Sequence, residues 1–203
     1  MTTSVEPYKA PAGSARCELR EKGSRFLAIV EPIEDEAAAR QRLKSLTTEN
    51  NDATHVCWAW RIGQPPIEGR SDAGEPAGTA GPPMLQVLRG TELSDVLAIV
   101  IRWYGGVKLG KGGLARAYSQ AVRQALEELP TVQRVPTVSL DVVVPYTGFG
   151  EVKRCVHPPD VEIVAERYAD QEVELTLEVA FDRLEWLEER LANVGAKATL
   201  PGE

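Results

Sequence analysis

Residues 97–126 contain the feature that most constrains the fold, because an apolar run is followed there by a glycine-rich segment and then by an amphipathic pattern. Five glycines fall within the nine residues from Gly105 to Gly113. The pattern predicts a strand, a glycine loop and a helix. Glycines gather where the backbone takes a positive φ or approaches another group closely, and the first N–H groups of a helix have no internal partner. Such a segment can hold an anion.

Basic side chains around the same helix start favour phosphate as the anion. Lys108, Lys111 and Arg116 lie near the predicted N-terminus of the helix, where its dipole already favours negative charge. Arg102 lies near the end of the preceding strand, beside aromatic residues. We therefore predict an anion- or RNA-binding site made of Arg102, Gly105, Gly106, Lys108, Gly110, Lys111, Gly112, Gly113 and Arg116.

The glycine loop also comes within one residue of a nucleotide-binding motif. Gly105, Gly110 and Lys111 fit the pattern GxxxxGK, but Gly112 stands where a P-loop needs Ser or Thr to bind magnesium. A nucleotide- or phosphate-ligand-binding protein or enzyme therefore remains an alternative. A second alternative is that the glycines only allow close packing of loop, helix and sheet. We assign no catalytic residue and no cofactor.

A second candidate cluster lies in the Gly- and Pro-rich residues 63–83, which we predict to be one long loop. Asp72 and Glu75 are either paired carboxylates for acid and base chemistry or caps of the local turns and of the following helix. Local ordering is the better interpretation, because no activated nucleophile lies nearby in the sequence. The loop residues expected beside the anion site are Asp72, Gly74, Glu75 and Thr79.

Two further groups of residues invite a functional interpretation. His55 and Cys57, and later Cys155 and His157, are each separated by one residue, which is not a usual zinc spacing, so we assign no metal site. Aromatic residues lie on two predicted strands next to arginines, where outward-facing rings would stack on unpaired bases, although core packing explains most of them. These aromatic residues are Trp58, Trp60, Trp103 and Tyr104.

The charge distribution divides the 203 residues into two parts. Residues 1–135 contain 17 Lys and Arg against 16 Asp and Glu, whereas residues 136–203 contain 6 against 14. The change falls at Pro130–Pro136, where two prolines bracket a connector. We predict an N-terminal domain over residues 1–135 and a C-terminal domain over 136–203. A local basic site on the first domain is compatible with the net charge of −7, because salt screens charges beyond about 8 Å.

Periodicity predicts the elements of both domains. In the first we expect a hairpin with strands 16–21 and 25–31, a helix over 35–46, a strand over 54–62 and a short helix over 84–88. In the second we expect strands 137–144, 161–168, 172–179 and 196–200 and helices 148–155 and 182–194. Their order is the ferredoxin-like βαββαβ. Alternation in residues 172–179 predicts one buried face and one acidic solvated face.

Composition and cysteine usage predict the cellular setting. Hydrophobic residues make up 43% of the chain, and no apolar run approaches the roughly 18 residues that a membrane span needs. The first residues show no basic start followed by an apolar core, so we expect a cytoplasmic protein without membrane contact whose first dozen residues are partly loose. Three widely spaced cysteines indicate free thiols.

Several long motifs resemble the IMPACT family, which includes bacterial YigZ-like proteins with two domains. Where the family usually has Arg-Tyr-Phe, this chain has Arg102-Trp103-Tyr104. The resemblance covers nearly all of the first domain, and the second resembles the domain that bacterial members append. The motifs that carry it are Ser24-Arg25-Phe26, Ala53-Thr54-His55, Asp72 to Pro82, Arg102 to Gly110 and Gly112 to Tyr118.

The resemblance implies an α+β protein. Its N-terminal βα domain would have the fold of a small-subunit ribosomal protein and of elongation factor G domain IV, and its ferredoxin-like C-terminal domain would resemble the last domain of that factor. Eukaryotic members resemble regulators of translation initiation. We therefore expect a non-enzymatic, ribosome-associated regulator of translation that binds RNA or a ribosome-associated protein through the glycine loop. The other alternative is a pure protein-interaction module whose acidic second domain binds a basic partner. The sequence leaves the oligomeric state open.

Overall fold

The computed structural model describes residues 7–201. They form two compact units that divide between Arg134 and Val135. Each unit combines helices with an antiparallel sheet, so the predicted α+β class is confirmed. No helix in residues 7–201 has the length and apolar character that a membrane crossing requires.

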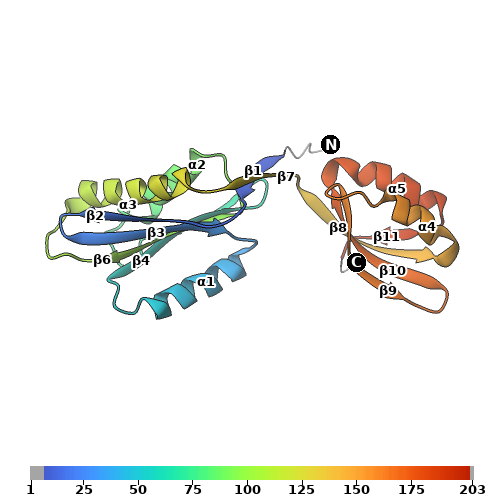
Figure 1. Ribbon diagram of the computed structural model, residues 1–203, viewed down its shortest axis with the longest axis horizontal. Coiled ribbons are helices and arrows are strands. Elements are labelled where there is room, and N and C mark those ends of the chain that lie inside the picture. The colour runs from blue at the N-terminus through green and yellow to red at the C-terminus, as the bar shows by residue number, and fades with distance from the viewer. Residues whose placement is uncertain (1–6, 202–203) are drawn as a thin grey trace. The chain divides into compact units, whose positions relative to one another are not determined.

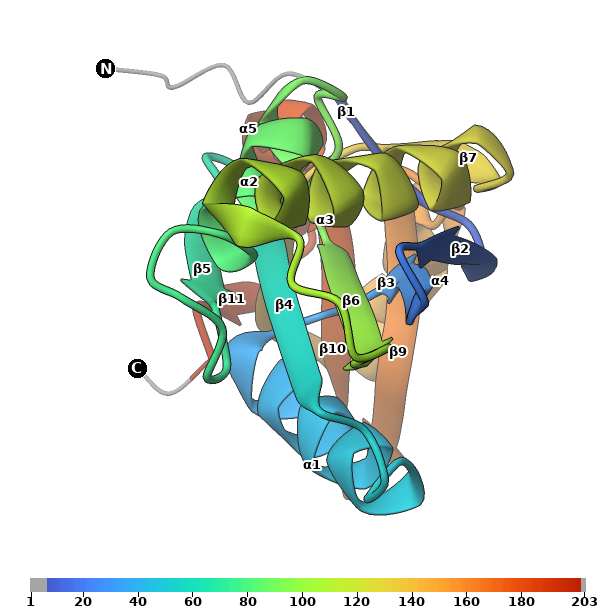
Figure 2. The same ribbon diagram turned by 90° about the vertical axis from the view of Figure 1, so that its left-hand side faces the viewer.

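The first unit is built on a five-stranded sheet (Figure 1), whose strand order β2-β3-β6-β4-β5 can be followed in Figure 2. Helices α2 and α3 cover one face of the sheet, and α1 covers the other (Figure 2). The bounds are β2 Ala15–Glu21, β3 Ser24–Pro32, α1 Glu36–Glu49, β4 His55–Ile62, β5 Ile67–Ser71, α2 Gly81–Arg89, β6 Val96–Trp103 and α3 Gly110–Glu127.

Strand β6 is apolar along most of its length because helices cover both of its faces. Val96, Ala98 and Val100 belong to the core beneath α2 and α3, whereas alternate residues such as Leu97 and Ile99 belong to the core beneath α1. One strand thus serves two cores. Its carboxyl end leads directly into the glycine loop, so the loop begins from the most buried strand of the sheet.

The predicted hairpin and the start of the first helix are confirmed. Strands β2 and β3 meet at Lys22 and Gly23, whose φ values of 45° and 80° suit a two-residue hairpin turn. Asp35 is the N-cap of α1, and its carboxylate accepts a hydrogen bond of 2.7 Å from the backbone N–H of Ala38.

One prediction about loops was wrong, and a second falls partly outside the described residues. Residues 63–83 are not one long loop, because β5 pairs with β4 at the sheet edge and α2 begins at Gly81. Of the first dozen residues, which we predicted to be partly loose, β1, Tyr8–Pro11, is ordered because it pairs with β7, Thr131–Arg134. Residues 1–6, on which the rest of that prediction falls, lie outside the described residues. β5 is ordered by pairing with β4, the strand just before it, and β1 by pairing with β7, which is distant in the sequence; neither segment has a clear period of its own.

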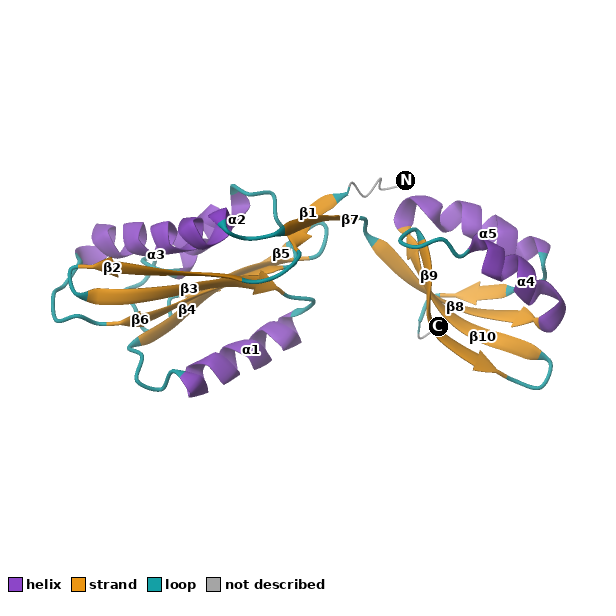
Figure 3. Cartoon of the chain, in the orientation of Figure 1, coloured by secondary structure: helices purple, strands orange, loops and turns teal. Residues whose placement is uncertain are grey.

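The second unit has the predicted βαββαβ order, with helices on one face of a four-stranded sheet (Figure 3). The strand order is β11-β8-β10-β9. Side chains of β10 alternate as predicted, with Val173 and Leu175 in the core and Glu172 and Glu174 on the opposite face. The bounds are β8 Thr137–Pro145, α4 Tyr146–Cys155, β9 Val161–Tyr168, β10 Glu172–Ala180, η1 Phe181–Arg183, α5 Leu184–Asn193 and β11 Lys197–Thr199.

Candidate functional site

The glycine loop begins with a contact between two backbones. A Cβ atom on Gly105 would lie 1.9 Å from the carbonyl carbon of Gly23, so no residue with a side chain fits at this position without a shift of the backbone. The backbone N–H of Gly105 donates a hydrogen bond of 3.2 Å to Oγ of Ser24. The loop is therefore held against the β2–β3 turn.

The remaining glycines of the loop serve different purposes. Gly106 and Gly110 have φ values of 87° and 71° with open space around them, so they are needed for their backbone conformation. Gly112 and Gly113 lie in the first turn of α3. A Cβ atom on Gly112 would meet only the flexible end of Arg116, at 3.4 Å.

The basic side chains of the predicted site are exposed at one end of the first unit. Lys108, Lys111 and Arg116 are all exposed or half-buried, and none of them forms an ion pair within 4.0 Å in the described part of the chain. Arg116 and Lys22 line a cavity of about 220 Å³ between the β2–β3 hairpin and α3. Sequence reasoning missed Lys22, since only the backbone contact at the turn brings it close to the loop.

The cavity beside the loop, which we call the basic cavity, is lined mainly by polar groups. Glu21 is the one acidic residue that lines it, against the two cations Lys22 and Arg116. The complete lining consists of Leu19, Glu21, Lys22, Leu109, Gly113, Arg116, Ala117 and Gln120. An anion that entered it would meet cations from two different elements as well as the N-terminal end of α3.

Arg102 occupies a different environment from the other predicted cations. Its side chain is only 6% exposed, and its Nη1 lies 2.6 Å from Oε1 of Glu75. Its Nη2 donates a hydrogen bond of 3.2 Å to Oγ of Ser24. Two of the three guanidinium nitrogens are thus paired within the protein, whereas Nε is buried without a hydrogen-bond partner among the described residues. Arg102 positions the glycine loop and the Asp72–Gly81 loop relative to each other.

Asp72 orders its own loop, as the second interpretation of the sequence predicted. Its carboxylate accepts hydrogen bonds of 2.8 to 2.9 Å from the backbone N–H groups of Gly78, Ala80 and Gly81, just before and at the start of α2. Burial acts to raise the pKa of Asp72, but these three N–H groups outweigh it and the pKa is lowered. Thr79 Oγ1 also donates to a carbonyl of this loop, that of Pro76.

Glu75 belongs to a buried polar network that the sequence did not reveal. Its Oε1 also accepts a hydrogen bond of 2.8 Å from the hydroxyl of Tyr118, and its Oε2 lies 3.9 Å from Nε2 of His55. Gly74 is packed against the His55 ring, where a Cβ atom would lie 3.3 Å from Nδ1. Residues from β3, β4, β6, the loop and α3 meet here, which no local spacing in the sequence indicates.

The thiol in this network is unsuited to nucleophilic attack. Cys57 donates to the carbonyl oxygen of Asp72, 3.0 Å away, or to the hydroxyl of Tyr118, 3.4 Å away. Burial raises the pKa of Cys57 to about 12 and raises the pKa of Tyr118 as well. Both groups are neutral at physiological pH, and the thiol, not the thiolate, predominates.

Only some of the aromatic residues are exposed. Trp58 and Trp60 lie on the same face of β4 and stack on each other with centroids 4.2 Å apart, and Trp60 is only 2% exposed beneath α1. Trp103 donates to Asp52. Tyr104, at the start of the glycine loop, is 44% exposed. Tyr104 therefore offers an exposed ring at the start of the loop, with its centroid 5.5 Å from Cζ of Arg102, whereas Trp60 is part of the core.

The two His and Cys pairs lie in different units, His55 and Cys57 in the first and Cys155 and His157 in the second. Residues 7–201 contain no group of three or more His, Cys, Asp or Glu side chains placed to hold a metal ion. All three cysteines are free thiols, as predicted.

Comparison with known proteins identifies the family. Residues 22–126 match the Impact N-terminal domain, and residues 142–196 match a domain of unknown function, DUF1949. The chain is 35% identical to the IMPACT family member YigZ of Escherichia coli over 167 residues, which cover 81% of this chain and 82% of that protein. It is 36% identical to an IMPACT family member of Haemophilus influenzae over 164 residues, 79% of this chain and 80% of that one.

The fold of the whole chain is found in a solved structure as well. A crystal structure described as a hypothetical protein matches with a TM-score of 0.75 and 31% identity, over 98% of both chains. Both domains of the chain thus have counterparts, in sequence and in structure. The chain belongs to the IMPACT family.

Proposed function

We propose that this protein is a non-enzymatic regulator that acts near translation and binds RNA through the basic end of its first unit. The basic end consists of Lys22, Tyr104, Lys108, Lys111 and Arg116. We place its role near translation because eukaryotic members of the family resemble regulators of translation initiation. Binding without catalysis is favoured because the buried thiol and tyrosine are neutral and Arg102 and Glu75 are paired with each other.

The observation that carries the proposal is the grouping of four cations around one loop and one cavity. Lys22 and Arg116 line the basic cavity, and Lys108 and Lys111 flank the same loop. Lysine and arginine that neutralise RNA phosphates release bound counterions, which is the main source of affinity for a nucleic-acid backbone. The exposed ring of Tyr104 adds a surface on which an unpaired base can stack, and RNA recognition commonly uses such bases.

The test is the salt dependence of binding to a fluorescent single-stranded RNA, measured by anisotropy. The double variant Lys108→Gln/Lys111→Gln removes two cations of the basic end. We expect weaker binding and a log–log salt slope that becomes shallower by about 0.7 for each phosphate that the variant no longer neutralises. The matched control is Lys44→Gln/Arg123→Gln, which removes two exposed cations on α1 and on α3 outside the basic end.

Equal weakening by both double variants, or binding that does not change when salt is doubled, would contradict the proposal. A thermal shift with nucleoside triphosphate that requires magnesium would instead support the nucleotide-binding alternative. Sedimentation of the wild type and of Lys108→Glu/Lys111→Glu with ribosomal particles then tests the link with translation. We expect only the wild type to travel with the particles.

A further inference from the structure

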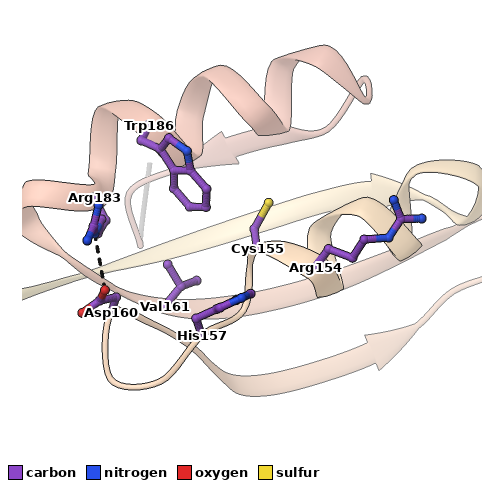
Figure 4. A pocket seen from close by; sticks show the side chains of 7 residues that line it. All are labelled: Arg154, Cys155, His157, Asp160, Val161, Arg183 and Trp186. Atoms are coloured by element: carbon purple, nitrogen blue, oxygen red, sulfur yellow. Dashed lines mark ion pairs between the residues drawn. The ribbon is translucent and has the colours of Figure 1, made fainter.

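The second unit contains a pocket that the proposed RNA-binding site does not use (Figure 4). Its volume is about 270 Å³. The end of α4, residues 156–160, the start of β9 and the segment from η1 into α5 surround it. Ligand pockets for drug-sized molecules measure roughly 300–1,000 Å³, so this one has the size for a single small ring system.

The floor and one wall of the pocket are apolar. Val161 and Cys155 are only 1% and 8% exposed, whereas Trp186 on α5 is 39% exposed. In Figure 4 the indole of Trp186 points toward Cys155 and Val161 from the opposite side of the pocket. Burial raises the pKa of Cys155, which keeps its thiol neutral. A large aromatic ring that stays accessible above an apolar floor offers a face to a planar group.

The pocket is lined by two arginines against one carboxylate, that of Asp160, in a domain that is otherwise acidic. Residues 136–203 contain 6 Lys and Arg against 14 Asp and Glu, and three of those six are close to this pocket. Arg154 and Arg183 line it, and the guanidinium of Arg190 lies 5.6 Å from the Trp186 ring centroid. His157 lines it too.

The carboxylates that face these arginines leave room for a ligand anion. Arg183 Nε lies 3.4 Å from Asp160 Oδ2, and both side chains are about half exposed. Arg154 pairs with Glu151 on its own helix. Arg190 forms no ion pair within 4.0 Å among residues 7–201. Water and salt screen exposed ion pairs, so a bound carboxylate or phosphate competes with them at little cost.

We propose that this pocket binds a small planar anion, an aromatic or heteroaromatic ring that carries a carboxylate or a phosphate. The ring lies against Trp186 above Val161 and Cys155. The anionic group lies toward Arg183 and Arg190, where it forms charge-assisted hydrogen bonds. The site belongs to the second unit and the basic end to the first, so the two proposals rest on different residues.

The test is a titration of the full chain followed by the indole N–H signal of Trp186 in ¹H–¹⁵N NMR spectra, which the variant Trp186→Phe assigns. The probes are indole-3-acetate for the carboxylate, adenosine monophosphate for the phosphate and indole as the neutral control. We expect at least one of the two anions to shift the signal in a saturable manner, and indole to bind at least tenfold more weakly. The anion that binds distinguishes the two sources of charge.

Variants test the contribution of charge. Arg183→Gln/Arg190→Gln is expected to lower the affinity for the anion that binds at least tenfold. The matched control Arg167→Gln/Lys197→Gln removes the same charge from the sheet of this unit, and it should change affinity less than twofold. His157→Ala, a change at an exposed position, gives a second weakening if the arginine variant does not fold, as its amide spectrum would show.

Three results would overturn the proposal. They are no shift of the Trp186 signal with either anion at 5 mM, binding of indole as tight as that of the anions, or a loss of affinity in the control variant equal to that in Arg183→Gln/Arg190→Gln. Each of them would leave the RNA-binding proposal intact, because that proposal concerns the first unit alone.

Discussion

Arg102 and Glu75 connect the end of β6 to the Asp72–Gly81 loop through an ion pair whose nitrogen and oxygen lie 2.6 Å apart. The two side chains are only 6% and 2% exposed. The hydroxyl of Tyr118 donates to the same carboxylate oxygen, so α3 is joined to the pair as well. One buried interaction therefore connects the two loops that the sequence singled out.

Removing one member of this ion pair should destabilise the folded protein. We expect Arg102→Met to lower the free energy of unfolding by about 3–5 kcal/mol, because it leaves the Glu75 carboxylate buried without its cation. Urea unfolding followed by circular dichroism measures the loss. The control is Arg89→Met, whose partner Glu68 forms an exposed ion pair. That change should cost much less stability than Arg102→Met, because water and salt screen the exposed pair. Equal losses would show that the buried pair has no special structural role.

Asp72 should make stability depend on pH in the acidic range. Its pKa is lowered in the folded protein, so its contribution is fully present above the unfolded pKa of about 4 and is lost as pH falls through the lower folded value. We expect Asp72→Asn to be less stable than the wild type at pH 7, by about 1 kcal/mol. The difference should shrink below about pH 4. Thermal unfolding from pH 7 to pH 2.5 measures it, and a constant difference would exclude this origin.

Two glycines of the loop should respond in opposite ways to alanine. Gly105→Ala places a Cβ atom against the Gly23 backbone, and we expect a loss of about 3 kcal/mol or more in the free energy of unfolding. Gly112 lies in the first turn of α3, and a Cβ atom there would meet only the end of Arg116. We therefore expect Gly112→Ala to raise the free energy of unfolding by up to about 1 kcal/mol. Denaturant unfolding of both variants is the measurement. A neutral Gly105→Ala would mean that the two backbones are not in contact in solution.

The thiols should differ in reactivity. Burial raises the pKa of Cys57 to about 12, so its thiolate is scarce at pH 8, whereas Cys17 is only half-buried. We expect iodoacetamide to alkylate Cys17 in the native protein and to leave Cys57 unmodified until urea unfolds the chain. Peptide mapping by mass spectrometry assigns the modified positions. Rapid native alkylation of Cys57 would place it outside the buried network.

Long periodic segments were predictable from the sequence, and short ones were not. Strand β6 and helix α3 have their own apolar patterns, and so do the elements of the second unit. Strand β5 lies among prolines and glycines at a sheet edge, and β1 and β7 pair only with each other among the described strands. β1 and β7 depend on a partner distant in the sequence, and β5 is a short edge strand that pairs only with β4, so a local period does not reveal any of the three.

The candidate site shows the same division. The charge and position of Lys108, Lys111 and Arg116 follow from local pattern, since they surround the start of a predicted helix. The burial of Arg102 does not follow from local pattern, because it depends on an ion pair with Glu75, which lies on a loop in another part of the chain. Lys22 lies near the site only because the β2–β3 turn contacts the start of the glycine loop.

That contact between Gly23 and Gly105 also sets a distance. Neither Gly23 nor Gly105 has a side chain, so their backbones touch directly. The hairpin turn therefore cannot move away from the loop without breaking this contact, or toward it without a steric clash. The separation between Lys22 and the start of α3 is therefore fixed by main-chain geometry and not by the long, flexible side chains themselves. For the RNA binding that we propose, the turn therefore sets the distance between cations, and lengthening it by a single residue is expected to change the spacing of phosphates that fits.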